Sequence, residues 1–140
     1  MPTADEAARR RAERAEQADY HVAEQRRRRE EEAERAQQLL DRFVARATAA
    51  GLPTEQLTAR PWSGRGRYRT GIVGWRLRRD GSVGVGVDGR YYELNVPSVP
   101  FGRWRTVRVR PTAPPLEVGR GARDGESFAL ETLIELRLDW

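Results

Sequence analysis

Two Asp-Gly pairs, at positions 80–81 and 88–89, divide residues 72–96 into three short runs of alternating apolar residues. An Asp-Gly pair between such runs is a strong signal for a tight β-hairpin turn, because glycine readily adopts the left-handed backbone conformation that these turns need. The stretch therefore predicts a three-stranded antiparallel meander. We expect the rest of the chain to pack around this small sheet.

The register of the two hairpins decides which side chains share a face, since side chains alternate along a strand. A three-residue loop at the first turn would pair Arg78 with Ser82, and a two-residue loop at the second would pair Val87 with Arg90. This register predicts a single apolar face that forms the core and contains Val73, Trp75, Leu77, Val83, Val85, Val87, Tyr92, Leu94 and Val96.

The opposite face of the meander has glycine where side chains are expected. Its middle strand contributes Gly84 and Gly86, and its neighbours are Arg76, Arg78 and Tyr91. Glycine inside a strand is destabilising unless another group comes close to the backbone. Two interpretations stay open. In the first, which we prefer, Tyr91 packs over Gly86; in the second, the face is a shallow groove with a glycine floor between arginine and tyrosine walls.

Residues 4–50 are rich in Ala, Arg, Glu and Gln and contain neither glycine nor proline, a composition that favours a long helix. From Ala33 onwards, apolar residues recur at helical spacing, and Gly51 is placed to end the helix. We therefore expect two parts: residues 1–51, a polar and partly exposed helix whose last turns dock, and residues 52–140, a small basic β-rich module. The docking stripe is predicted to be Ala33, Ala36, Leu40, Phe43, Val44 and Ala47.

Weaker patterns describe the remaining segments. Residues 52–71 are expected to be a connector, and the alternation in residues 104–110 predicts a fourth, edge strand. Residues 119–125 are expected to form a loop without the spacing of a phosphate-binding motif. Residues 127–140 fit both a helix and a strand, and their composition favours a short helix.

The predicted fold class is therefore α+β. It consists of a long N-terminal helix, a small antiparallel sheet made of the three-stranded meander plus a fourth strand, and a short C-terminal helix.

Composition excludes several functional classes. The chain has no cysteine, and its single histidine, His21, lies in the polar helix without the partners that a metal site or a catalytic triad needs. No apolar run approaches the roughly 20 residues of a membrane span. We expect no enzymatic activity, no metal, no cofactor and no membrane association, and a cytoplasmic location.

Positive charge is concentrated on the β-rich segment. All 26 cationic residues are arginine; residues 1–46 hold eleven arginines and eleven acids, whereas residues 60–110 hold twelve arginines and three acids. Arginine interleaved with aromatic residues suits phosphate contact and base stacking on single-stranded nucleic acid. The candidate nucleic-acid-binding residues are Arg67, Tyr68, Arg69, Arg76, Arg78, Tyr91, Trp104 and Arg108.

The leading hypothesis is a non-enzymatic binding module that presents a basic, aromatic-containing sheet surface to single-stranded nucleic acid or to an acidic protein. The alternative is a protein–protein or self-association module that works through the N-terminal helix, for example as a coiled-coil homo-oligomer. A plainer interpretation is that the aromatic residues cover the edges of a small core while the arginines keep it in solution.

Overall fold

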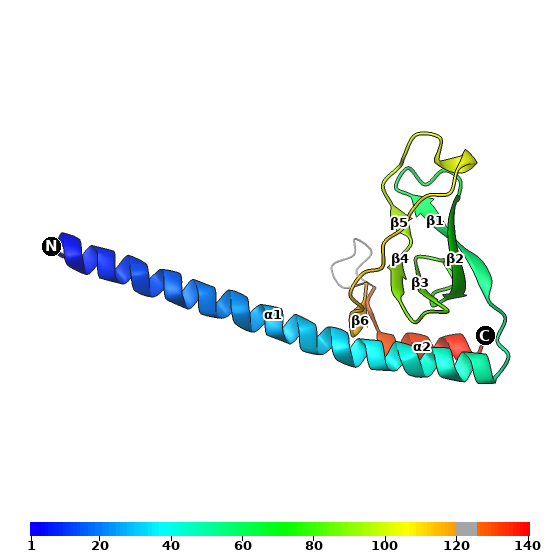
Figure 1. The fold of residues 1–140 in the computed structure, drawn as a ribbon, viewed down its shortest axis with the longest axis horizontal. Coiled ribbons are helices and arrows are strands. Elements are labelled where there is room, and N and C mark those ends of the chain that lie inside the picture. Colours follow the sequence, from blue (N-terminus) through cyan, green and yellow to red (C-terminus); the bar gives the residue numbers. More distant parts are fainter. Residues whose placement is uncertain (120–125) are drawn as a thin grey trace. The chain divides into compact units, whose positions relative to one another are not determined.

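The computed structural model describes residues 1–119 and 126–140, so most of the loop expected at 119–125 lies outside the described residues. The predicted α+β class, the long first helix, the antiparallel meander and the C-terminal helix are all confirmed (Figure 1). The elements are α1 (Ala4–Ala49), β1 (Glu55–Pro61), β2 (Tyr68–Arg76), β3 (Val83–Gly86), β4 (Tyr91–Glu93), β5 (Asn95–Val96), the 3-10 helix η1 (Gly102–Trp104), β6 (Glu117–Val118), β7 (Phe128–Ala129) and α2 (Leu130–Leu138).

The chain divides into two compact units, Met1–Glu32 and Ala33–Trp140. Within the first unit, all of which the structure describes, no residue is buried. The buried residues of α1 all belong to the second unit, which confirms that the last turns of the helix dock: they are Ala36, Leu40, Phe43 and Ala47.

Local signals fix both ends of α1. At its start, the Thr3 and Glu6 side chains each accept a hydrogen bond from the other residue's amide at 3.2 Å, which is a capping box. At its end, Gly51 adopts a φ of 66°, and the Leu52 amide donates to the Ala47 carbonyl at 2.9 Å. A left-handed glycine of this kind ends a helix without the steric cost that a Cβ would bring.

Strands β1 to β5 form one mixed sheet in the order β4-β3-β2-β1-β5, with β5 parallel to β1. The two outermost strands, β4 and β5, are separated in the chain by Leu94 alone. The Leu94 amide donates to the Ser82 carbonyl at 2.8 Å, and its carbonyl accepts from the Arg60 amide at 2.7 Å. One residue thus joins the two edges, and the sheet closes on itself.

The sheet extends beyond the meander through β1 and β5, and not through residues 104–110. The sequence predicts a connector at 52–71, whereas β1 and the first half of β2 form there. Because β1 lies along one side of β2 and β3 along part of the other, the later segment meets β2 only at Arg69, through an isolated bridge from Thr106. Further along the chain, Thr112 makes an isolated bridge with Tyr91 of β4.

The first hairpin has the predicted register, and the second does not. Trp75 lies opposite Val85 in the first, with a three-residue loop in which Gly81 has a φ of 75°. In the second, Val85 lies opposite Tyr91, so this loop also has three residues instead of the predicted two. The one-residue shift places Tyr91, and not Tyr92, on the face of Val85.

The two turns are stabilised in the same way by their aspartates. The Oδ1 atoms of Asp80 and Asp88 accept hydrogen bonds from the amides of Ser82 at 2.9 Å and Arg90 at 3.0 Å. Burial raises the pKa of Asp80, but hydrogen bonds from Ser82 and the charge of Arg78 outweigh it and leave the pKa below its usual value. A shared turn chemistry explains why both loops have the same length.

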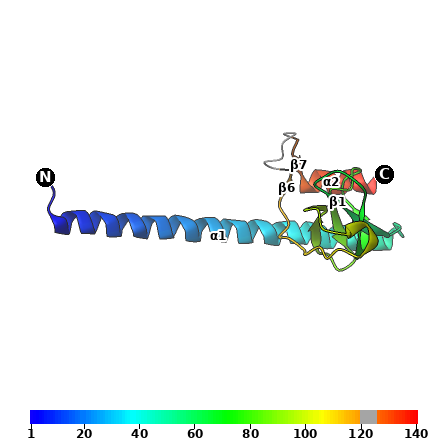
Figure 2. The same ribbon diagram turned by 90° about the horizontal axis from the view of Figure 1, so that it is seen from above.

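Both faces of the sheet are buried, so the predicted single apolar face is wrong. On one face, a first apolar cluster is covered by α1 and by α2, which lies beside the last turns of α1 (Figure 2). A second cluster lies on the other face and contains Tyr92 and Leu94, which the prediction placed on the same face as Trp75. Val73 and Val87 are half-exposed and Val96 is partly buried. The sheet residues of the first cluster are Trp75, Leu77, Val83, Val85 and Tyr91; the second consists of Leu57, Tyr92 and Leu94.

The glycines of β3 make room for the second cluster. A Cβ at Gly84 would lie 3.0 Å from Leu57 Cδ1 and 3.4 Å from Leu94 Cδ1. A Cβ at Gly86 would lie 3.3 Å from Tyr92 Cε2. The glycine floor is therefore a packing surface and not a groove, and the ring that covers Gly86 belongs to Tyr92, not to Tyr91.

Replacing Leu94 by alanine tests this arrangement of two buried faces. The side chain is fully buried, so Leu94→Ala should lower the free energy of unfolding by about 2–5 kcal/mol in urea denaturation. Val87→Ala, at a half-exposed position, should change it by less than about 0.5 kcal/mol. Equal losses for the two variants would contradict the register described here.

Candidate nucleic-acid interface

The sheet does not present the tyrosines that the sequence suggested as stacking residues. Tyr91 is 2% exposed and lies in the first cluster, and Tyr68 is 5% exposed. Burial also raises the pKa of Tyr91 above its usual value. A base can stack only on a ring whose face is accessible, so these two residues cannot have that role.

Two of the predicted arginines lie at the β2–β3 hairpin and are paired there. The Nε of Arg76 is 2.5 Å from a carboxylate oxygen of Glu55, and a guanidinium nitrogen of Arg78 is 3.8 Å from Asp80. Arg67 also reaches this hairpin, with its guanidinium against Gly81. These three arginines are therefore at a different place from Trp104.

Three large aromatic side chains project into solvent at the loops that link the strands. Trp62 follows β1, Phe101 precedes η1 and Trp104 is its last residue; these three residues are 73–74% exposed. We call these three residues the aromatic rim. In Figure 1 the two loops that carry them lie at the end of the sheet opposite α2. Two hydrogen bonds tie the loops together: the Trp62 amide to the Val96 carbonyl at 2.9 Å, and the Ser63 amide to Ser98 Oγ at 3.4 Å.

Tyr68 supports the rim from below. Its hydroxyl accepts a hydrogen bond from the Val99 amide at 3.2 Å and lies 3.4 Å from the Val99 carbonyl. A Cβ at Gly102 would lie only 2.5 Å from Cζ of the tyrosine ring, so the loop needs glycine to pack this closely. Tyr68 thus positions the loop between Phe101 and Trp104 instead of contacting a ligand itself.

Phe101 has an unusual backbone conformation. Its φ is 57°, and it is the only described residue other than glycine with a positive φ. The left-handed conformation costs a residue with a Cβ on the order of 1–3 kcal/mol, and such outliers gather at functional sites. A large apolar ring is thus exposed at a position where the backbone is strained.

Unpaired arginines surround the rim. Arg65, Arg103 and Arg105 are exposed and form no ion pair with any described residue; we call them the rim arginines. Arg103 packs across the other loop, with its Nε 3.0 Å from the place of a Cβ at Gly66. A pocket of about 250 Å³ lies between the loops, lined by Ser63, Arg65, Tyr68, Val99, Phe101, Gly102, Arg103 and Trp104.

The rim differs from the predicted site in its members. Trp104 of the predicted set belongs to the rim. Arg69 lies beside Thr106, in the segment that follows Trp104, and Arg108 of the same segment is exposed. Trp62 and Phe101 were missed. Both directly follow a proline within stretches, 59–79 and 94–116, that together hold eleven arginines and no acidic residue, and this pattern could have indicated them.

Within residues 1–119 and 126–140, no three acidic, histidine or cysteine side chains are grouped so that they could hold a metal ion. None of the helices described there combines the length and the apolarity needed to cross a bilayer.

Comparison with known proteins gives no match: no family model, curated protein or solved structure is significantly similar to this chain.

Tyr68→Phe tests how the rim is held. Loss of the hydroxyl removes its hydrogen bond from the Val99 amide, so stability should fall by about 1 kcal/mol. Hydrogen exchange of that amide, followed by NMR, should become faster. Tyr20→Phe, at an exposed position of α1, is the matched control and should change neither quantity. Unchanged exchange at Val99 in Tyr68→Phe would show that the loop is held by something else.

Proposed function

We propose that this protein is a non-enzymatic module that binds single-stranded nucleic acid through the aromatic rim and the rim arginines. The observation that carries the proposal is that three large aromatic rings are exposed on two loops that hydrogen bonds connect. Neither loop contains an acidic residue. Exposed rings of this size have an energetic cost in water, and a cluster of them beside cations is typical of a contact surface. A cytoplasmic location, expected from the sequence, is part of this proposal.

Stacking and charge would each supply part of the affinity. Every base has a π-face, so stacking on Trp62, Phe101 or Trp104 is tolerant of sequence. The rim arginines have no carboxylate partner among the described residues and can therefore contact phosphates, with release of counterions. Double-stranded nucleic acid fits this surface less well, because its bases are not available for stacking on protein rings.

The surface in this proposal is not the sheet surface suggested by the sequence. Both faces of the sheet are covered, and Arg76 and Arg78 are engaged with carboxylates at the far hairpin. The proposal therefore keeps Trp104, Arg69 and Arg108 of the predicted set in or near the surface and assigns Tyr68 a supporting role.

Trp104→Ala should weaken the binding of a fluorescein-labelled oligothymidylate. Stacking contributes about 1–3 kcal/mol per base, so the affinity measured by anisotropy should fall roughly fivefold to 150-fold. Replacing both Arg103 and Arg105 by glutamine should weaken binding and also reduce its dependence on salt.

The matched control replaces Arg26 and Arg27, two exposed arginines of α1, by glutamine. It removes the same charge and should leave binding nearly unchanged. Absence of binding at low salt, or equal losses in the control and the rim variants, would contradict the proposal.

A second candidate function is association with another protein, or with a second copy of the chain, through the helix of Met1–Glu32. The observation in its favour is that Tyr20 and Val22 are exposed near the middle of this unit. An apolar helix contact should persist at high salt, whereas phosphate contacts should not. Sedimentation at low and high salt tests this candidate: an oligomer that persists at high salt and is dissociated by Val22→Glu would support it, and a monomer in both conditions would remove self-association.

A further inference from the structure

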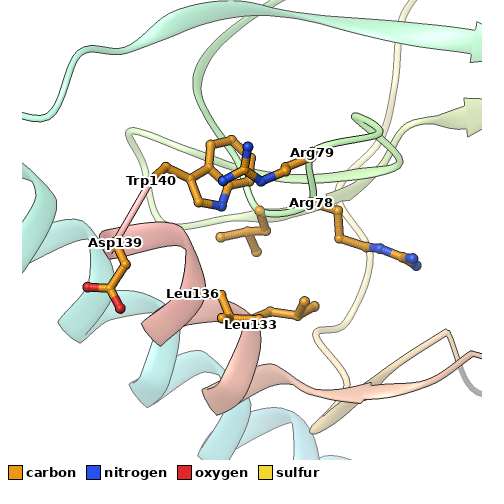
Figure 3. Close-up of a pocket in the computed structure, with 7 residues that line it drawn as sticks. Arg78, Arg79, Leu133, Leu136, Asp139 and Trp140 are labelled. Carbon is orange, nitrogen blue, oxygen red and sulfur yellow. The ribbon is translucent and has the colours of Figure 1, made fainter.

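Trp140, the second residue after the end of α2, lies among three arginines. The Cζ atoms of Arg137, Arg79 and Arg76 are 4.3, 5.0 and 5.9 Å from the centre of its ring. Figure 3 shows the Arg79 side chain lying against the indole. These residues come from α2 and from the β2–β3 hairpin, so tertiary packing brings the three cations together.

Carboxylates neutralise only part of the charge of these three arginines. Of the three, only Arg76 forms an ion pair with a described residue, Glu55. Arg137 is 9% exposed, and its Nε donates to the Arg76 carbonyl at 2.7 Å. Its terminal amino groups make no hydrogen bond with a described residue. Burial lowers the pKa of Arg137, and the charge of Arg76 lowers it further. The charge of Glu55 opposes both effects on this pKa but does not outweigh them.

The end of α2 accounts for one of these arginines but not for all of them. A cation near the C-terminus of a helix interacts favourably with the helix dipole, which explains Arg137. Arg79 belongs to another element, its guanidinium donates no hydrogen bond to a described residue, and it has no carboxylate partner there. The Trp140 ring, whose centre is 5.0 Å from Cζ of Arg79, accounts for its position, and its N–H groups are able to donate to an anion.

A pocket of about 280 Å³ adjoins this group, and of its three arginines only Arg79 lines the pocket. Its floor is formed by leucines, of which Leu136 is half-exposed (Figure 3). Asp139 also borders the pocket, and its carboxylate points away from Arg79 in the same view. The complete lining is Leu77, Arg78, Arg79, Leu133, Leu136, Asp139 and Trp140.

We propose that this pocket is a second binding site, separate from the aromatic rim, that takes an acidic peptide segment with aliphatic side chains. Arg79, with Arg78 beside it in the lining, complements carboxylates, and the leucine floor complements an aliphatic side chain next to them. Nucleic acid fits this pocket less well than the rim, because the Trp140 ring is already in contact with guanidinium groups. The site does not depend on the proposed function of the rim.

The test uses fluorescein-labelled peptides in which glutamate alternates either with leucine or with serine. The Glu-Leu peptide should bind saturably and more tightly than the Glu-Ser peptide, and a Lys-Leu peptide should not bind. Arg79→Gln should weaken the binding of the Glu-Leu peptide about tenfold, corresponding to roughly 1.4 kcal/mol for one charged contact. Leu136→Ser should weaken the Glu-Leu peptide and leave the Glu-Ser peptide unchanged.

Two comparisons separate this site from the rim. Arg103→Gln, which removes the same charge at the rim, should leave peptide binding unchanged, and an oligothymidylate should not displace the peptide. Arg79 and Leu136 are both exposed, and thermal melting of the variants checks that the fold is kept. Equal affinity for the Glu-Leu and Glu-Ser peptides, no binding of the Glu-Leu peptide at low salt, or displacement of the peptide by oligothymidylate would each overturn the proposal. The last result would assign the pocket to nucleic acid.

Discussion

The structure depends on the closure of its sheet at Leu94. This residue is fully buried and connects the edge strands β4 and β5; its amide bonds to Ser82, next to β3, and its carbonyl to Arg60 of β1. Closure satisfies edge groups that an open sheet would leave available for pairing. It also bends the sheet around a second apolar cluster, so that neither face remains free for a ligand.

The two proposed sites therefore lie at the ends of the sheet and not on its faces. At one end, two loops expose the aromatic rim over the ring of Tyr68. At the other, the β2–β3 hairpin meets α2 and gathers arginines around Trp140. Strand ends and loops can vary in sequence without loss of packing, which is why binding residues are concentrated there in many folds.

Much of the fold could be predicted from the sequence, because its signals were local. Helical spacing from Ala33, the glycine at position 51 and the first Asp-Gly turn each specify one element without knowledge of the rest. The second hairpin could not be solved in the same way. Its register was inferred by assuming one buried face, and the parity argument fails when both faces are buried. β1 was missed because its buried positions alternate Leu57 with Ala59 and Pro61, a weak strand signal.

The candidate site was predicted less well, because exposure is a tertiary property. Tyr68 and Tyr91 have the same local sequence signal as Trp104, an aromatic residue among arginines, yet only Trp104 is exposed. The composition of the basic segment indicates the kind of residues in the candidate site, while tertiary packing, of Tyr68 against Gly102 and of Tyr91 in the first cluster, decides which of them reach solvent.

The four tryptophans allow the central claim, that single strands bind at the aromatic rim, to be tested in one NMR titration. Each indole N–H gives its own signal: two at or near solvent on the rim, one on Trp140, and one on buried Trp75, whose Nε1 donates to the Leu52 carbonyl at 3.1 Å. When an oligothymidylate is added, the Trp62 and Trp104 signals should shift with saturation, while those of Trp75 and Trp140 stay in place. Shifts confined to Trp140, or no shift at any indole at low salt, would contradict the account.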